Sequence, residues 1–196
     1  MFRLLGLHAG AEVSSAAAAA LDDVPISVVK HQLQELASVH LLQEGAHDRY
    51  RLHDLLRAYS VERGQREEPQ RERTHAIRRM LGWYLRTADV ARQIILPYSH
   101  SVALVSAGRI PTPSFDDADS AMEWYEKERL NLLGALQQAM DLGQYDIAWK
   151  LPVVSDGFFE LRSYWKEWKQ IHQEGLVAAQ TVGDSLGEAS NLLCLG

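Results

Sequence analysis

The sequence is poor in cysteine and has no long apolar run. Cys194 is the only cysteine, so an intrachain disulfide is excluded and a reducing, cytoplasmic location is expected. Every apolar run is far shorter than the roughly 20 residues that a membrane span requires. No charged-then-apolar leader follows Met1. We therefore expect a protein that does not associate with membranes.

Groupings of residues that carry out catalysis are also lacking. The eight histidines show no metal-ligand spacing with cysteines or carboxylates, so no metal site is predicted. Glu123, Glu126 and Glu128 have no nucleophile or pocket residue grouped with them, and they do not form a credible acid–base pair. No Gly-x-x-x-x-Gly-Lys-Ser/Thr loop is present to hold a nucleotide phosphate with magnesium. These absences predict a protein that is not an enzyme, with no catalytic residues.

The composition is that of a globular protein, and its charge is unevenly distributed. Apolar residues make up 46% of the chain and charged residues 23%. Residues 115–196 carry six basic and fourteen acidic side chains. An acidic half of this kind is unsuited to wrapping a nucleic-acid backbone. Residues 65–95 have a small basic excess, but arginines and glutamates alternate there as on a solvated helix face.

The first 66 residues predict a winged-helix arrangement. Ser14 or Ser15 is suited to cap the alanine run 16–20, and a second helix with apolar residues at helical spacing follows Pro25. Two short β-prone runs around a glycine-containing loop, at 41–44 and 49–52, indicate a hairpin. A third helix then opens at His53.

The rest of the chain predicts helices only. A polar joint at 64–69 precedes a long amphipathic helix that Pro97 ends, and residues 98–115 are expected to be a loop. Ser120 and Glu123 form a capping-box pattern before the next helix. The segment 145–161 is expected to be a helix that kinks because it contains Pro152 and Gly157, and a further helix ends near Gly183. The predicted division is a winged-helix subdomain at 1–66, a linker helix and loop at 67–115, and antiparallel helical hairpins at 116–196.

Two groups of residues in the helical half are interpreted as structural. Asn131 lies in an otherwise apolar helix and is expected to be a buried residue with satisfied hydrogen bonds. The aromatic series Phe159, Tyr164, Trp165 and Trp168 is expected to fill a core and not to form a platform for stacking bases.

His53 and Asp54 stand at the junction of a strand-like run and a helix. Such a helix N-terminus favours an anion, and an imidazole adds one more hydrogen-bond donor. The alternative is structural: Asp54 caps the helix, and His53 is an ordinary junction residue.

Several segments resemble a known family. The runs 2–7, 40–42 and 50–57 are similar to the C-terminal winged-helix subdomain of bacterial NB-ARC (STAND-class) ATPases. The runs 128–132, 159–162 and 183–189 resemble the helical segment that follows it in actinobacterial regulators of the antibiotic regulatory protein type. Residues 189–196 match the opening of a tetratricopeptide repeat. Both ends of the chain look interrupted, so we expect a segment of a longer protein.

The resemblance implies roles for the junction residues. His53 matches the histidine that touches the β-phosphate of ADP in the resting state, and Asp54 matches a residue that supports the subdomain. Leu52 replaces the usual methionine, which is a mild change. This chain alone is expected to have no cofactor, because it has no P-loop. The full-length protein is expected to bind ADP or ATP with magnesium through an upstream nucleotide-binding core.

The predicted function is therefore regulatory. A winged helix senses the nucleotide state through His53 and relays it to helical repeats that bind an unidentified protein or effector. A second hypothesis is a DNA-binding winged-helix transcription factor with a helical sensor or dimerisation domain. Its recognition helix, about 25–39, offers only Lys30 as a cation, opposed by Glu35, so no direct nucleic-acid contact is expected.

Overall fold

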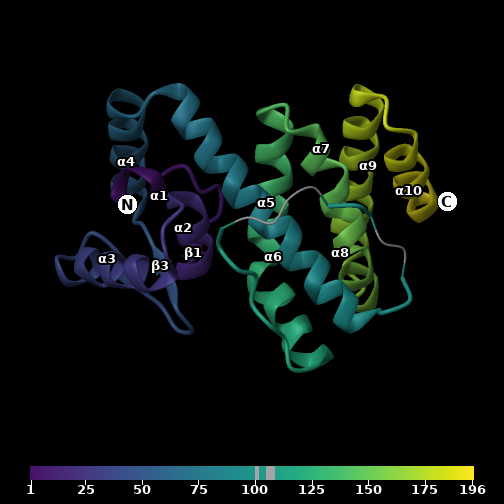
Figure 1. The fold of residues 1–196 in the computed structure, drawn as a ribbon, viewed down its shortest axis with the longest axis horizontal. Coiled ribbons are helices and arrows are strands. Elements are labelled where there is room, and N and C mark those ends of the chain that lie inside the picture. Colours follow the sequence, from purple (N-terminus) through teal and green to yellow (C-terminus); the bar gives the residue numbers. More distant parts are fainter. Residues whose placement is uncertain (100–101, 105–108) are drawn as a thin grey trace. The chain divides into compact units, whose positions relative to one another are not determined.

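The computed structural model describes residues 1–99, 102–104 and 109–196 (Figure 1). The chain is mainly α-helical, as predicted, and its small antiparallel sheet has three strands, one more than the predicted hairpin. Among the described residues, 1–83 and 109–111 form one compact unit, and 84–99, 102–104 and 112–196 form the other. The boundary falls within the long helix α5 (Gln70–Ile95), which contributes residues to both units. The predicted division at residues 66 and 115 stays a prediction.

The first unit combines short helices with the sheet. Its elements are, in order, α1 (Phe2–Leu5), β1 (Glu12–Ser14), α2 (Ser15–Asp22), α3 (Ile26–Ser38), β2 (Gln43–Glu44), β3 (Arg49–Arg51) and α4 (Asp54–Glu67). β3 lies between β1 and β2 and is antiparallel to both, so that Arg51 is opposite Glu12 on one side and Gln43 on the other. The predicted hairpin is confirmed, whereas the sequence patterns did not indicate β1.

Local signals explain where α2 and α3 begin. The Ser14 hydroxyl accepts a hydrogen bond from the Ala17 N–H at 3.2 Å, so Ser14 is the cap, one of the two residues considered. Asp23 ends α2 in the left-handed region, and Pro25 immediately precedes α3. The four alanines at 17–20 in α2 have almost no exposed surface, because their small side chains let this part of the helix lie inside the unit.

Helix α4 is longer than expected, and two glycines, Gly6 after α1 and Gly64 within α4, let α1 approach it closely. A Cβ on Gly6 would lie 2.5 Å from the Ser60 hydroxyl oxygen, and a Cβ on Gly64 would lie 3.1 Å from the Arg3 carbonyl oxygen. Ser60 also accepts from the Gly6 N–H at 3.0 Å. Gly64 is therefore a packing residue inside α4. The prediction of a polar joint at 64–69 is wrong for 64–67, and the joint consists of Glu68 and Pro69.

The second unit contains the end of α5 and the helices α6 (Ala118–Asp141), α7 (Tyr145–Ala148), α8 (Lys150–Leu161), α9 (Trp165–Val182) and α10 (Ser185–Leu195). The sequence predicts the capping box at Ser120 and Glu123, one turn too late. In the structure Asp117 caps α6 and exchanges hydrogen bonds with Ser120. Where the sequence predicts a kinked helix, the helix is interrupted at Trp149, between α7 and α8. Pro152 has no N–H to donate to the Ala148 carbonyl, which explains the position of the break.

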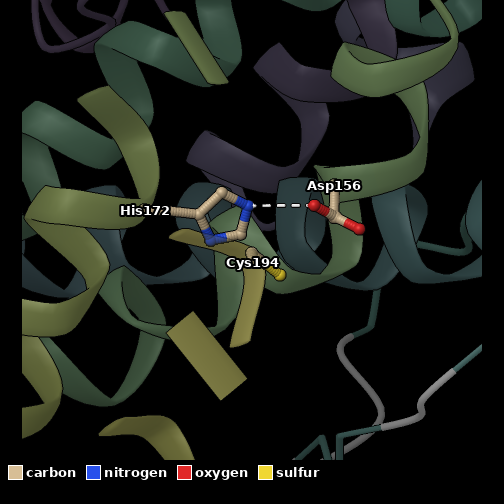
Figure 2. A group of neighbouring side chains, drawn as sticks. All are labelled: Asp156, His172 and Cys194. Carbon is tan, nitrogen blue, oxygen red and sulfur yellow. Dashed lines mark hydrogen bonds and ion pairs between the residues drawn. The ribbon is translucent and has the colours of Figure 1, made fainter. Parts of the chain in front are cut away.

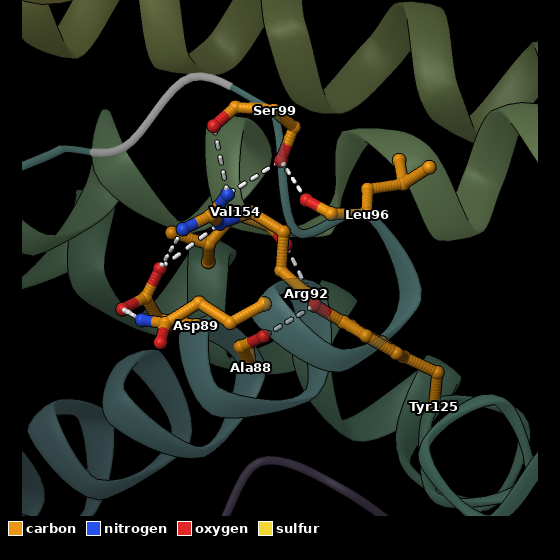
Figure 3. Close-up of polar contacts among 8 residues, drawn as sticks. Ala88, Asp89, Arg92, Leu96, Ser99, Tyr125 and Val154 are labelled. Atoms are coloured by element: carbon orange, nitrogen blue, oxygen red, sulfur yellow. Dashed lines mark hydrogen bonds and ion pairs between the residues drawn. The ribbon is translucent and has the colours of Figure 1, made fainter. Parts of the chain in front are cut away.

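Polar groups buried among the helices of the second unit are joined by hydrogen bonds (Figure 3). The Tyr125 hydroxyl of α6 lies 2.7 Å from the Ala88 carbonyl oxygen of α5 and 2.6 Å from the Val154 carbonyl oxygen of α8. On α5, the Arg92 guanidinium donates to Asp89 at 2.9 and 3.0 Å. These contacts give the buried hydroxyl of Tyr125 hydrogen-bond partners and pair the buried charges of Arg92 and Asp89. Without such partners, buried polar and charged groups destabilise a core.

The two structural interpretations have different outcomes. Asn131 is buried and donates from Nδ2 to Glu128 Oε2 at 2.6 Å, as expected. Phe159 is fully buried, but Trp165 is 54% exposed, so the expectation of a common aromatic core is wrong for Trp165. Trp165 is the first residue of α9, where one side of the ring faces solvent and the other lies edge-on against Trp168.

Candidate functional site

His53 lies directly between β3 and α4. It is the N-cap residue of α4 with extended backbone angles, and its side chain does not cap the helix. The imidazole is exposed to solvent. Because His53 is the N-cap residue, its ring nitrogens and the backbone N–H groups of the first turn lie at the same end of α4.

An open hollow of about 560 Å³ adjoins this junction. It is lined by His53 together with residues from the end of α3, from β2 and from the segment between them: Gln34, Ala37, Ser38, His40, Leu42, Gln43 and Glu44. His40 adopts a left-handed backbone conformation at φ 59°. The hollow is polar and broad, which suits a surface that meets another molecule better than it suits a deep small-molecule pocket.

Asp54 is exposed in the first turn of α4, and its charge acts on Arg57 one turn later. The Arg57 guanidinium donates to the carbonyl oxygens of His8, Gly10 and Ala11 at 2.7, 2.6 and 3.2 Å. Burial lowers the pKa of Arg57, and Asp54 opposes that change. Arg57 thus ties α4 to the turn before β1, a positioning role that the sequence patterns did not assign to it.

A second cluster of polar side chains lies in the helical unit (Figure 2). Asp156 of α8, His172 of α9 and Cys194 of α10 place one carboxylate oxygen, one ring nitrogen and the thiol sulfur within 4.8 Å of one another. His172 Nε2 lies 3.1 Å from Asp156 Oδ1, and Trp168 Nε1 donates to the same oxygen at 2.8 Å. The prediction of no metal site, made from spacing along the chain, did not anticipate this cluster.

A cavity of about 220 Å³ opens beside the cluster. Asp156 and Cys194 line one part of it, and apolar side chains that include Leu96, Val153 and Leu193 line the rest. His172 has no exposed surface, whereas 31% of the Asp156 side chain is exposed. Small molecules and ions therefore have access to the cluster from the side of Asp156 and Cys194.

Comparisons with known proteins identify regulatory homologues. "Regulatory protein AfsR" of Streptomyces coelicolor (strain ATCC BAA-471 / A3(2) / M145) is 36% identical over 142 residues, which cover 70% of this chain and 14% of that protein. "Regulatory protein AfsR" of Streptomyces griseus is 34% identical over 143 residues, which cover 72% of this chain and 15% of that protein. No family model matches the chain, and no solved structure gives a significant match.

The chain is thus homologous to part of a regulatory protein and spans about one seventh of the length of these curated relatives. The regulatory class agrees with the sequence-based prediction. Among the helices that the structure describes, none is both long and apolar enough to cross a bilayer.

Proposed function

We propose that this chain is a non-catalytic regulatory segment of a nucleotide-switched transcriptional regulator. Residues 1–66 act as a winged helix that senses ADP or ATP on a P-loop core outside this chain. Residues 116–196 act as the start of a tetratricopeptide-like array that binds a protein partner or effector. The homology to two regulatory proteins supports the general class. One observation carries the finer mechanism: His53 is exposed at the strand–helix junction, at the N-terminus of α4.

The junction offers a phosphate two kinds of interaction. The N-terminal end of α4, a helix of 14 residues, supplies backbone N–H donors and the positive end of the helix dipole. The His53 ring supplies a further hydrogen-bond donor. A single such contact is too weak for useful nucleotide affinity, so His53 adds to binding by the P-loop core and does not replace it.

The polar contacts of α4 connect this junction to the rest of the first unit. Arg57 holds the turn before β1, and Ser60 donates to the Phe2 carbonyl at 2.8 Å, so α1 and α4 move together. At the far end of α4, Arg73 of α5 donates to the carbonyl groups of Gly64 and Gln65 at 3.4 and 3.3 Å. A shift of the His53 end therefore reaches α5 as a rigid-body movement, which is the type of change that nucleotide switches use.

The DNA-binding alternative has less support at its presumed recognition helix. On α3, Lys30 Nζ lies 3.4 Å from Asp48 Oδ2, and His31 lies 3.3 Å from Glu35. Asp48 competes with phosphate for the Lys30 ammonium group, and Glu35 does the same for the His31 ring. Binding of this chain to duplex DNA with a steep salt dependence would favour the alternative.

The test uses the protein in which this segment follows its nucleotide-binding core. His53→Ala is expected to lower the amount of ADP that is retained through purification and to raise regulatory activity in the absence of a signal. His75→Ala, a substitution of an exposed histidine on α5, is the matched control and should change neither quantity. Unchanged ADP retention and unchanged activity in His53→Ala would refute the assignment.

A further inference from the structure

The cluster of Asp156, His172 and Cys194 brings a carboxylate oxygen, a ring nitrogen and a thiol sulfur within 4.8 Å of one another. The amide group of Asn191 on α10 fixes the orientation, because its Nδ2 donates to the carbonyl oxygens of Trp149 at 3.2 Å and Gly187 at 2.9 Å. Its Oδ1 therefore faces His172 Nδ1 at 3.0 Å and accepts a hydrogen bond from it.

His172 then has one nitrogen left, and that nitrogen faces a second acceptor. In the neutral imidazole only one ring nitrogen carries a proton, and Asn191 engages it. Nε2 would then direct a lone pair at Asp156 Oδ1 from 3.1 Å. Two lone pairs at this distance repel, so either a proton or a metal ion must lie between them. His172 has no exposed surface, so solvent does not compensate the charge of the proton or metal ion that lies there.

We propose that Asp156 Oδ1, His172 Nε2 and Cys194 Sγ bind a divalent transition-metal ion, with Zn²⁺ the best match to this mixed oxygen, nitrogen and sulfur ligand set. Zinc bonds of about 2.0–2.3 Å in a tetrahedral site separate the ligand atoms by roughly 3.3–3.8 Å. The observed separations, 3.1 Å for Nε2 to Oδ1 and at most 4.8 Å within the set, require only a small movement to reach that geometry.

The surroundings resemble the supporting shell of a metal site. A histidine ligand ordinarily donates its second ring N–H to a fixed acceptor, and Asn191 Oδ1 is such an acceptor for His172. Trp168 donates to the carboxylate of Asp156 and orients it. Asp156 and Cys194 also line the cavity of about 220 Å³, so water has a route to a fourth coordination position.

Close packing of α9 and α10 is a precondition for this arrangement. A Cβ on Gly175 would lie 2.5 Å from Asn191 Oδ1, so only glycine leaves room for the acceptor of the His172 proton. The three ligands come from α8, α9 and α10, and a bound ion would cross-link the three helices. Metal binding should therefore stabilise the folded helical unit.

Binding must release protons. Burial, reinforced by the charge of Asp156 and by Glu160, raises the pKa of the Cys194 thiol to about 12, so the thiol is protonated at neutral pH. When the Sγ–metal bond forms, the S–H bond breaks and its proton passes to solvent. Any proton on His172 Nε2 is also lost. The affinity should rise about tenfold per pH unit for each proton released.

The test is a titration of the purified 196-residue chain with Co²⁺, which reports thiolate ligation by a charge-transfer band in the near ultraviolet. One equivalent of Co²⁺ should produce this band, and Zn²⁺ should displace it. Cys194→Ser should abolish the band, and Asp156→Asn should weaken Co²⁺ binding at least about tenfold. His31→Ala removes an exposed histidine that lies 3.3 Å from Glu35, a pair able to hold an adventitious ion, and should keep the band.

Three results would overturn the metal-site proposal. Absence of the band in the wild-type chain, or a band that survives Cys194→Ser, would overturn the proposal. A nitrogen NMR spectrum in which both His172 nitrogens stay protonated with metal present would also overturn it, because a proton would then be the shared cation. Circular dichroism of Cys194→Ser, whose helix content should equal that of the wild type, separates loss of a ligand from loss of fold.

Discussion

At the residue scale, Arg57 carries the connection between α4 and the turn before β1. Its guanidinium donates to three carbonyl oxygens, and removal of the side chain would leave part-buried acceptors without a donor. Arg57→Met should lower the free energy of unfolding by about 2–3 kcal/mol. Arg51→Met, at an exposed position on β3, is the control and should have little effect in the same urea titration. Equal stability of the two variants would exclude the positioning role of Arg57.

His8 makes the stability of the first unit depend on pH. It is 3% exposed, and its Nδ1 accepts from the Gly10 N–H at 3.1 Å. Burial lowers the pKa of His8 from 6.5 to about 4, and the nearby charge of Arg57 adds to this effect. Between these values the unfolded chain binds more protons than the folded chain, so the stability falls as the pH drops from about 6.5 to about 4. The loss is at most about 3 kcal/mol.

The substitution His8→Asn tests this assignment. The amide oxygen of asparagine keeps an acceptor for the Gly10 N–H but does not titrate. Thermal unfolding measured between pH 4 and pH 7 should therefore show a weaker pH dependence in His8→Asn than in the wild type. An identical pH dependence in the two proteins would mean that other groups cause the loss of stability.

At the element scale, Gly187 sets how closely α10 approaches α9 and Trp149. A Cβ at this position would lie 2.8 Å from Trp149 Cδ2 and 2.9 Å from the Ala179 Cβ, two groups held in a packed core. Gly187→Ala should therefore lower stability by roughly 1–3 kcal/mol. In the control variant Gly196→Ala, the added methyl group lies 3.6 Å from the Leu192 carbonyl oxygen, an ordinary contact. The free energy of unfolding of this variant should therefore equal that of the wild type. A stabilised Gly187→Ala protein would contradict the close approach.

Long elements follow from sequence patterns more directly than short ones. The 26 residues of α5 carry a periodic apolar face and precede Pro97, so both the helix and its end are predicted. β1 is missed because it has three residues and one fully buried side chain, Val13, too little for an alternating pattern. Gly64 is misread because its role depends on Arg3, a residue far away in the sequence.

The candidate sites differ in the same way: a site formed by neighbouring residues can be predicted from the sequence, and a site formed by packing of distant helices cannot. The position of His53 follows from local patterns, because a strand-like run and a helix start meet there in the sequence. The Asp156–His172–Cys194 cluster depends on the packing of α8, α9 and α10 and leaves no spacing signal. The orientation of Asn191, which makes His172 Nδ1 the donor of their hydrogen bond, likewise exists only in the folded unit.

At the scale of the whole molecule, α5 belongs to both compact units and is the covalent route between the proposed sensor and the proposed repeat array. The sensor end is held by α1 and Arg57, and the array end by the buried Tyr125 and Arg92 contacts. The proposed relay from His53 requires α4 and α5 to shift together, and only Glu68 and Pro69 separate these two helices in the sequence.

The rate at which ADP dissociates tests this account most directly. It is measured by stopped flow with a fluorescent ADP analogue, on the longer protein in which we propose that a P-loop core precedes this segment. Loss of one hydrogen bond to a charged phosphate should make release from His53→Ala roughly ten- to a hundredfold faster than from the wild type, with His75→Ala unchanged. Equal dissociation rates in His53→Ala and the wild type would contradict the claim that His53 senses the nucleotide.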